Sequence, residues 1–222
     1  MSYHVFIDFD GTITRQDVGY NFFKIFAEGK AEPAVQQYRR GEISAVECLQ
    51  AECDIYNEYP AAVSKVREFI DKQEITGGFM DFVAYCREHD HKLTILSAGF
   101  DFYILPILKR LNVDDIELYA TPTFIKQGKI YPEFVRYDEN ACVHCADCKG
   151  ERIKELKAKT DLAIFIGDGH SDSHGAEQAD IVFAKSFLAE YLDTAGIKYL
   201  PYGDFHDIIR SFENGLKLGE QE

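Results

Sequence analysis

The sequence of 222 residues is poor in basic side chains and contains no long apolar run. Lysine and arginine number 24 against 38 aspartates and glutamates, and the formal net charge at pH 7 is −14. This excess of negative charge disfavours nucleic acid and anionic membranes as main partners, because their phosphates repel it. No stretch approaches the roughly 20 apolar residues that a membrane-spanning helix needs. We therefore expect partners that are neither nucleic acid nor membrane.

Targeting signals and repeats are also missing. The first residues have neither the basic nor the apolar segment of a secretory signal peptide, so we expect a cytoplasmic protein. There is no internal repeat and no low-complexity segment, and nothing in the sequence indicates an oligomeric state. Hydrophobic residues form 46% of the chain and charged residues 28%, which is typical of a folded globular protein. The length allows one large domain, or a core and a smaller domain.

Short β-branched and aromatic runs alternate with helical patterns over most of the chain. The predicted strands cover residues 3–8, 92–99, 116–123, 162–169, 180–184 and, as an edge strand, 197–202. Strands that alternate with helices predict right-handed crossovers and a doubly wound parallel sheet with helices on both faces, an α/β fold. Residues 124–134 resemble a hairpin that turns at Gly128.

A long helical stretch interrupts this alternation after the first strand. Residues 17–73 carry no strand signal. Ser44 and Glu47 have the spacing of a capping box, and Pro60 is expected to open a further helix. We therefore predict a core domain formed by residues 1–14 and 76–222, with a helical cap domain inserted at 15–75.

Polar side chains stand where the predicted strands end. In open parallel sheets, ligands bind at the carboxyl ends of the strands, so these side chains are expected to share one site. They are Asp8, Asp10, Ser97, Asp168 and Asp172, together with Lys149 at the start of a helix.

This set of residue types suits phosphoryl transfer through a covalent intermediate. One aspartate can attack phosphorus and become an aspartyl-phosphate, and a second acid can protonate the leaving alcohol and then activate water. Mg²⁺ prefers oxygen ligands and keeps several waters, so two or three acids suffice to bind it. Ser97 and Lys149 would supply a donor and a positive charge to the phosphate. The expected ligand is a small phosphorylated metabolite.

The motifs DFDGT (residues 8–12), Ser97, Lys149 and GDGHSD (residues 167–172) resemble, in this order, those of the haloacid dehalogenase superfamily. The resemblance implies that Asp8 is the nucleophile and Asp10 the general acid and base. It implies Mg²⁺ bound by Asp8, the backbone carbonyl of Asp10, and Asp168. The phosphate would be held by Ser97, Lys149 and Thr12, with Asp172 and Gly169 in supporting roles.

The helical insertion implies a C1-type cap, as in the phosphoserine phosphatases. Residues 75–108, 180–188 and 199–208 resemble the 2-hydroxy-3-keto-5-methylthiopentenyl-1-phosphate phosphatases of methionine salvage. Phosphoserine phosphatases and phosphoethanolamine/phosphocholine phosphatases are the alternatives. Asp17 stands roughly where phosphoserine phosphatases keep an acid for the substrate amine, and Gly99 is a further candidate for substrate contact.

Three of the six cysteines are closely spaced before Lys149. Cys142, Cys145 and Cys148, with His144 among them, have the composition of a structural Zn²⁺ site. A thiol-rich loop that only shapes the neighbouring site is an equal alternative.

Two other functional classes remain open. A non-catalytic module could sense a phosphorylated ligand or a metal with the same scaffold, and a phosphotransferase could pass the phosphoryl group to an alcohol. The pair Asp8 and Asp10 favours an enzyme, because a pure binding protein has no use for a general acid.

Overall fold

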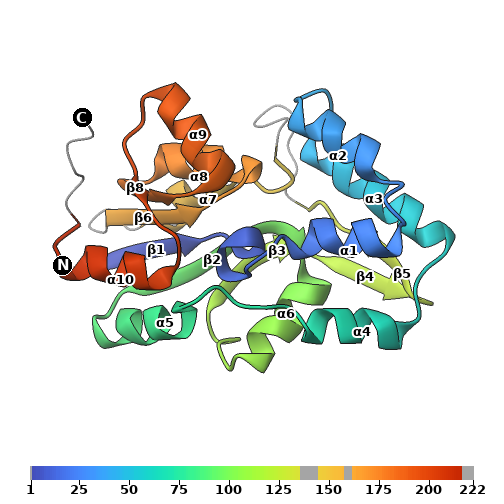
Figure 1. The fold of residues 1–222 in the computed structure, drawn as a ribbon, viewed down its shortest axis with the longest axis horizontal. Helices are drawn as coiled ribbons and strands as arrows, with labels where there is room; N and C mark the ends of the chain where they lie inside the picture. The colour runs from blue at the N-terminus through green and yellow to red at the C-terminus, as the bar shows by residue number, and fades with distance from the viewer. Residues whose placement is uncertain (1, 136–144, 158–161, 217–222) are drawn as a thin grey trace.

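A parallel six-stranded sheet forms the centre of the computed structural model, which describes residues 2–135, 145–157 and 162–216. Its order is β3-β2-β1-β6-β7-β8, and every neighbouring pair is parallel (Figure 1). The strands are β1 (Tyr3–Ile7), β2 (Lys92–Phe100), β3 (Glu117–Thr121), β6 (Leu162–Gly167), β7 (Ile181–Ala184) and β8 (Leu200–Pro201). The predicted doubly wound α/β fold is confirmed, and the short β8 lies at the edge.

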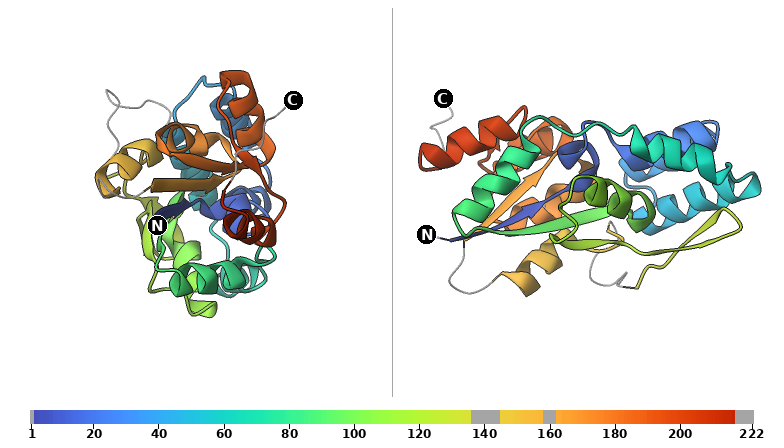
Figure 2. Two further views of the ribbon diagram at one scale, coloured as in Figure 1. Left: turned by 90° about the vertical axis from the view of Figure 1, so that its left-hand side faces the viewer. Right: turned by 90° about the horizontal axis from the view of Figure 1, so that it is seen from below.

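Helices cover both faces of this sheet because side chains alternate along each strand. Val5 and Ile7 pack in one cluster with α5 (Phe79–Glu88), α6 (Asp101–Arg110) and α10 (Phe205–Glu213). Phe6, between them, packs on the opposite face with α7 (Lys149–Leu156), α8 (Ser173–Gln178) and α9 (Ser186–Ala195). Figure 2 shows the sheet between these two helical layers. No helix in the described ranges has both the length and the apolar character needed to span a bilayer.

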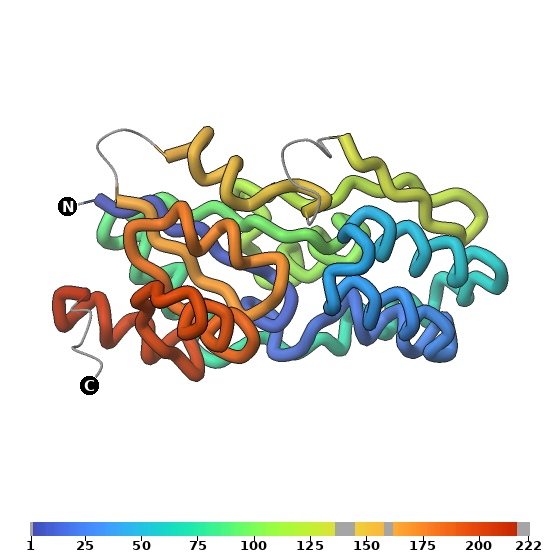
Figure 3. Tube along the Cα trace, turned by 90° about the horizontal axis from the view of Figure 1, so that it is seen from above, coloured from blue at the N-terminus to red at the C-terminus, as the bar shows by residue number. Residues whose placement is uncertain are grey.

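Four helices follow the first strand and lie at one end of the elongated molecule (Figures 1 and 3). They are α1 (Val18–Phe26), α2 (Glu32–Arg39), α3 (Ala45–Glu58) and α4 (Val63–Asp71). An isolated antiparallel bridge between Thr14 and Ile75 joins the points where the chain leaves and re-enters the sheet region. The predicted capping box is present at the start of α3.

The predicted start of the last of these helices at Pro60 is wrong. Helix α4 begins at Val63, after the extended N-cap residue Ala62, whose ψ is 137°. A proline sets its own φ, but the first helical turn also needs the following residues in helical conformation.

A two-stranded hairpin runs beside α3, as Figure 3 shows. It consists of β4 (Thr123–Lys126) and β5 (Lys129–Pro132), and Gly128 turns it with a φ of +78°. The side chain of Asn57 in α3 accepts a hydrogen bond from the Ile130 N–H at 2.8 Å and donates to the Ile130 carbonyl at 2.7 Å. The predicted hairpin is confirmed, and it packs against the helices that follow the first strand.

Candidate active site

Three carboxylates meet at the carboxyl ends of β1 and β6. Asp8 follows β1, and the chain then makes one wide turn, η1 (Phe9–Ile13), with Gly11 at a φ of +81°. A Cβ on Gly11 would lie 2.5 Å from Asp168 Oδ2, so only glycine lets the backbone approach this carboxylate. Oxygens of Asp8, Asp168 and Asp172 lie within 4.8 Å of one another. The sequence prediction that these acids converge therefore agrees with the geometry.

The buried ammonium group of Lys149 lies between two of these acids. Its Nζ donates to Asp8 Oδ1 and to Asp172 Oδ1, each at 2.5 Å. The second oxygen of Asp172 accepts the backbone N–H groups of Asp168 and Gly169 at 2.9 and 2.8 Å. Asp172 thus orients Lys149 and holds the turn η2 (His170–Asp172) against the end of β6.

Three carboxylates, those of Asp8, Asp168 and Asp172, lie close together beside the single positive charge of Lys149. Burial, and then the charge of Asp172, raise the pKa of Asp8 well above its ordinary value, although Lys149 opposes the shift. Burial and Asp172 likewise raise the pKa of Asp168 to about 6. A divalent cation would relieve this repulsion, and carboxylate oxygens are the ligands that Mg²⁺ prefers. The donor set therefore fits Mg²⁺.

The carboxylate of Asp10 contacts the start of α1 and the side chain of Tyr103. Its Oδ1 accepts the N–H groups of Val18 and Gly19 at 2.9 and 3.3 Å, and its Oδ2 accepts the Tyr103 hydroxyl at 2.7 Å. Burial and the charge of Asp17 raise the pKa of Asp10 to about 7. The side chain can therefore either give or take a proton near neutral pH.

Because Gly99 has no side chain, Tyr103 and Asp10 can approach each other beside it. A Cβ at this position would overlap Tyr103 Oη and Asp10 Oδ2. The backbone N–H of Gly99 donates to Ser97 Oγ at 2.9 Å, which fixes the serine hydroxyl at the end of β2. Gly99 is thus adjacent to both Asp10 and Ser97.

Thr12 is fully buried behind these acids. Its hydroxyl donates to Asp168 Oδ1 at 2.9 Å. The predicted contact of Thr12 with phosphate would therefore need its backbone N–H, because the hydroxyl is engaged by Asp168.

A cavity of ≈ 670 Å³ opens between these strand ends and helices α1 to α3. Asp8, Asp10, Ser97, Gly99, Asp168 and Gly169 line one side of it. The other side carries apolar residues and several charged ones: Phe23, Val35, Leu49, Asp17, Arg39 and Glu52. The carboxylate of Asp17 accepts the Tyr20 N–H at 2.8 Å and caps α1, so this predicted substrate residue also has a local structural role.

Two residues of the site were not predicted from the sequence. Lys185 lines the cavity and its positive charge interacts with Asp168. It directly follows β7, so the rule on strand ends could have identified it. Tyr103 contacts Asp10 across 93 residues of sequence, and no local pattern indicates that contact.

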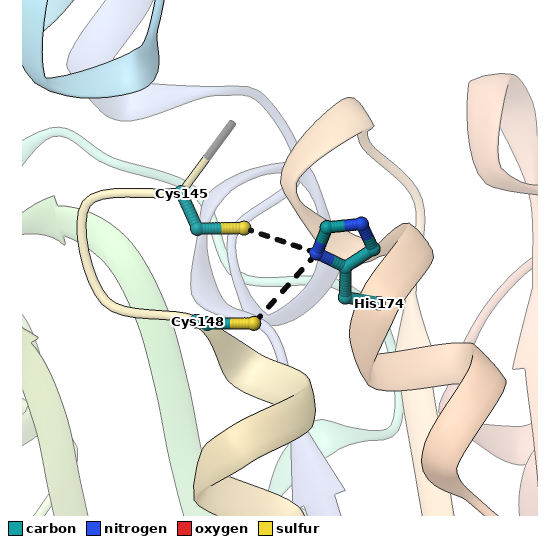
Figure 4. Close-up of side chains that lie close together, drawn as sticks. All are labelled: Cys145, Cys148 and His174. Carbon is teal, nitrogen blue, oxygen red and sulfur yellow. Dashed lines mark hydrogen bonds between the residues drawn. The ribbon is translucent and has the colours of Figure 1, made fainter. Parts of the chain in front are cut away.

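The cysteine-rich stretch is described only in part. Cys142 and His144 lie outside the described residues. Cys145 and Cys148 are described, and both lie close to His174 in α8 (Figure 4). His174 was not in the predicted ligand set, because it follows Cys148 by 26 residues.

Comparison with known proteins identifies a matching family model, curated relatives and similar solved structures. The model of the haloacid dehalogenase-like hydrolase family matches residues 5–177. A curated protein of Bacillus cereus (strain AH820), named 2-hydroxy-3-keto-5-methylthiopentenyl-1-phosphate phosphatase, is 31% identical over 98% of this chain and 99% of its own. The protein of that name from Bacillus thuringiensis (strain Al Hakam) is also 31% identical, with the same coverage of 98% and 99%.

Similar solved structures include a substrate-bound phosphoserine phosphatase, with a TM-score of 0.72 and 18% identity over 95% of this chain and 98% of that one. A phospho-aspartyl intermediate analogue of phosphoserine phosphatase has a TM-score of 0.71 and 19% identity, covering 94% and 98%. At identities of 18% and 19%, the similarity to these structures shows a shared fold and nothing more.

Proposed function

The chain belongs to the haloacid dehalogenase-like hydrolase family, and from this premise we propose that it hydrolyses a small phosphomonoester through a phosphoryl group carried on Asp8. The proposal rests on the two ion pairs of Lys149, with Asp8 and with Asp172, each at 2.5 Å. Asp168 and Asp10 lie beside them. Lys149 holds one oxygen of Asp8, which leaves the other to act as nucleophile.

The reaction proceeds in two steps. The free oxygen of Asp8 attacks phosphorus, the bond between phosphorus and the leaving oxygen breaks, and Asp10 donates its proton to that leaving oxygen, which departs as the alcohol. Asp10 then takes a proton from a water that attacks phosphorus, and the bond to Asp8 breaks to release phosphate. Mg²⁺, held by Asp8, Asp168 and the Asp10 carbonyl, would supply positive charge beside the phosphate oxygens. Ser97, Lys149 and the Thr12 N–H bind the remaining oxygens.

Residues 15–75 act as a cap domain over a core formed by 1–14 and 76–222. The support for this proposal is that the cavity lies between the strand ends and α1 to α3, while the Thr14–Ile75 bridge ties the two connections together. A cap that closes over the substrate excludes water during the first transfer and admits it for the second. Such a cavity suits small metabolites.

The preferred substrate is 2-hydroxy-3-keto-5-methylthiopentenyl-1-phosphate, after the name of the full-length relatives. The apolar side chains of Phe23, Val35 and Leu49 in the cavity offer a surface for a methylthio tail, while the phosphate meets the acidic and cationic groups at the strand ends.

A phosphorylated amine is the second candidate. Asp17 and Glu52 place two acids in the same cavity, where they could pair with an ammonium group. Phosphoserine, phosphoethanolamine and phosphocholine belong to this class.

A panel of phosphomonoesters tests the proposal. Phosphate release is measured with Mg²⁺, with and without EDTA, on the enzymatically generated enol-phosphate, phosphoserine, phosphoethanolamine and phosphocholine. We expect chelator-sensitive turnover with the enol-phosphate well above the rest. Preference for an amine would select the second candidate. Binding of these esters without any turnover would support a non-catalytic module instead.

The nucleophile is tested by Asp8→Asn beside Asp114→Asn. Asp114 is an exposed acid in the turn that precedes β3, so its variant should retain wild-type turnover. Asp8→Asn should lose turnover while keeping the circular dichroism spectrum of the wild type. Undiminished phosphate release by Asp8→Asn would overturn the mechanism.

A further inference from the structure

Outside the proposed catalytic groups, a second cluster of metal-ligating side chains joins α7 to α8. Cys148 is the N-cap of α7, Cys145 lies three residues before it, and His174 is in the first turn of α8. The two sulfurs lie 3.5 Å (Cys145) and 3.7 Å (Cys148) from Nδ1 of His174. Figure 4 shows both side chains pointing to the same ring nitrogen.

Cys148 is hydrogen-bonded to both Cys145 and His174, so the three side chains already form one connected cluster. A ring nitrogen carries either one proton or one lone pair, so Nδ1 forms one well-directed hydrogen bond. A cation between the three atoms would instead engage all of them at once. Cys145 is buried and the other two side chains are half-buried, so such an ion would be largely screened from solvent.

The distances match those around a tetrahedral zinc ion. With Zn–S of about 2.3 Å and Zn–N of about 2.1 Å, tetrahedral ligands lie about 3.6 Å (S to N) and about 3.8 Å (S to S) apart. The observed S-to-N distances of 3.5 and 3.7 Å bracket the first value, and all three ligand atoms lie within 4.8 Å of one another. An ion would fit with little movement of the side chains.

We propose that Cys145, Cys148 and His174 bind a thiophilic transition-metal ion, Zn²⁺ being the best fit, as three of the four ligands that a tetrahedral ion takes. Two thiolates neutralise the two charges of the ion, and sulfur ligands select such metals over Mg²⁺. The site is therefore chemically distinct from the carboxylate site at the strand ends.

The location of this metal site gives it a positioning role. Cys148 immediately precedes Lys149, and His174 follows Asp172 by two residues, so the ion would tie together the two segments that carry this ion pair. The helices already touch there, since a Cβ on Gly150 would lie 2.6 Å from the His174 carbonyl oxygen. This role rests on the proposed function of Lys149, whereas the metal site does not.

Metal content tests the site directly. The untagged full-length chain is purified without chelator, dialysed against limiting Zn²⁺, passed over a desalting column and analysed by mass spectrometry for total metal. We expect about one equivalent in the wild type and in His89→Asn, which changes an exposed histidine in the C-cap of α5. Cys148→Ser and His174→Asn should each lose most of it. A wild type with no retained metal would overturn the proposal and leave hydrogen-bonded thiols only.

Cobalt gives a readout that tests the site in the wild type, whether or not the variants fold. Co²⁺ bound by thiolates in a tetrahedral site shows strong visible bands and sulfur-to-metal charge transfer in the ultraviolet, unlike Co²⁺ bound by carboxylates and water. We expect these bands in the wild type, and their absence there would contradict the site. Bands that survive in a folded double variant, Cys148→Ser with His174→Asn, would also contradict it.

Turnover separates the metal site from its positioning role. In a folded His174→Asn variant we expect a lower kcat, a smaller change in KM, and recovery of neither on adding Zn²⁺. Metal loss with unchanged kcat would overturn the positioning role alone. A wild type that binds metal but hydrolyses no phosphomonoester would instead count against the proposed function.

Discussion

Asp10 shows how one side chain is prepared for proton transfer. Three hydrogen bonds hold it, and burial beside Asp17 raises its pKa to about 7. A group with a pKa near the working pH serves best as both acid and base.

We therefore expect Asp10→Asn to lower kcat by roughly 10²- to 10⁴-fold, because an amide cannot exchange the proton. Its backbone carbonyl remains, so Mg²⁺ binding should persist. Steady-state kinetics and Mg²⁺ titration measure the two effects, with Asp114→Asn as the control. A kcat within threefold of wild type would remove Asp10 from the mechanism.

Glu52 illustrates a cost of the cavity. Burial, together with the charges of Asp17 and Glu32, raises its pKa from 4.5 to about 8. As the pH rises from 4.5 to 8, the unfolded chain releases this proton before the folded one does. The folded state is therefore progressively destabilised across this range.

Glu52→Gln removes this ionisation, so it should stabilise the protein by about 4 kcal/mol at pH 8 and by about 1 kcal/mol at pH 5. Urea unfolding at the two pH values measures the difference. Glu58→Gln changes an exposed acid at the end of the same helix and is the matched control. An equal effect of Glu52→Gln at both pH values would contradict this explanation.

At the scale of elements, helix starts were predictable where a side chain supplies the missing backbone partner. Ser44 Oγ accepts the Glu47 N–H at 3.2 Å, and Glu47 accepts the Ser44 N–H at 2.7 Å. This reciprocal pair is local, so four residues of sequence were enough to identify it. The start assigned to Pro60 failed because proline supplies no such partner.

Ser44→Ala should lower the free energy of unfolding by about 1 kcal/mol. The Glu47 N–H loses its acceptor, and the Glu47 carboxylate loses the hydroxyl that helps to hold it against the Ser44 N–H. Ser64→Ala, an exposed position within α4, is the matched control and should change stability by less than half as much. The midpoint of urea unfolding measures both. Equal midpoints for Ser44→Ala and the wild type would show that the capping box adds nothing to stability.

At the scale of the whole molecule, the sheet brings acids from distant segments together before any ligand binds. Asp8 and Asp168 are 160 residues apart in sequence, yet their oxygens lie within 4.8 Å. Their repulsion opposes folding, and a bound cation would remove it.

We therefore expect Mg²⁺ to raise Tm relative to EDTA, because an ion that binds only the folded state adds about 2.7 kcal/mol at a hundredfold excess over its Kd. Differential scanning fluorimetry measures the shift. Asp168→Asn should abolish most of it, and Asp114→Asn should retain it. A shift of the same size in Asp168→Asn would place the ion elsewhere.

The alternation of strands and helices, and the polar residues at strand ends, were evident from the sequence. Parallel crossovers bring the ends of all strands to one edge, so Asp8, Ser97 and Asp168 could be grouped from their place in the pattern alone. This reasoning needs only the periodicity of hydrophobic residues within each segment and the order of strands and helices along the chain.

Pairings between side chains of separate helices and loops were decided by the tertiary structure. Tyr103 of α6 meets Asp10 because its ring lies between Phe9 of η1 and Gly19 of α1, and His174 meets Cys148 because α8 packs against α7. Such contacts depend on how helix faces fit together, and many packings share one hydrophobic pattern. For this reason the contact of His174 with Cys145 and Cys148 could not be read from the sequence.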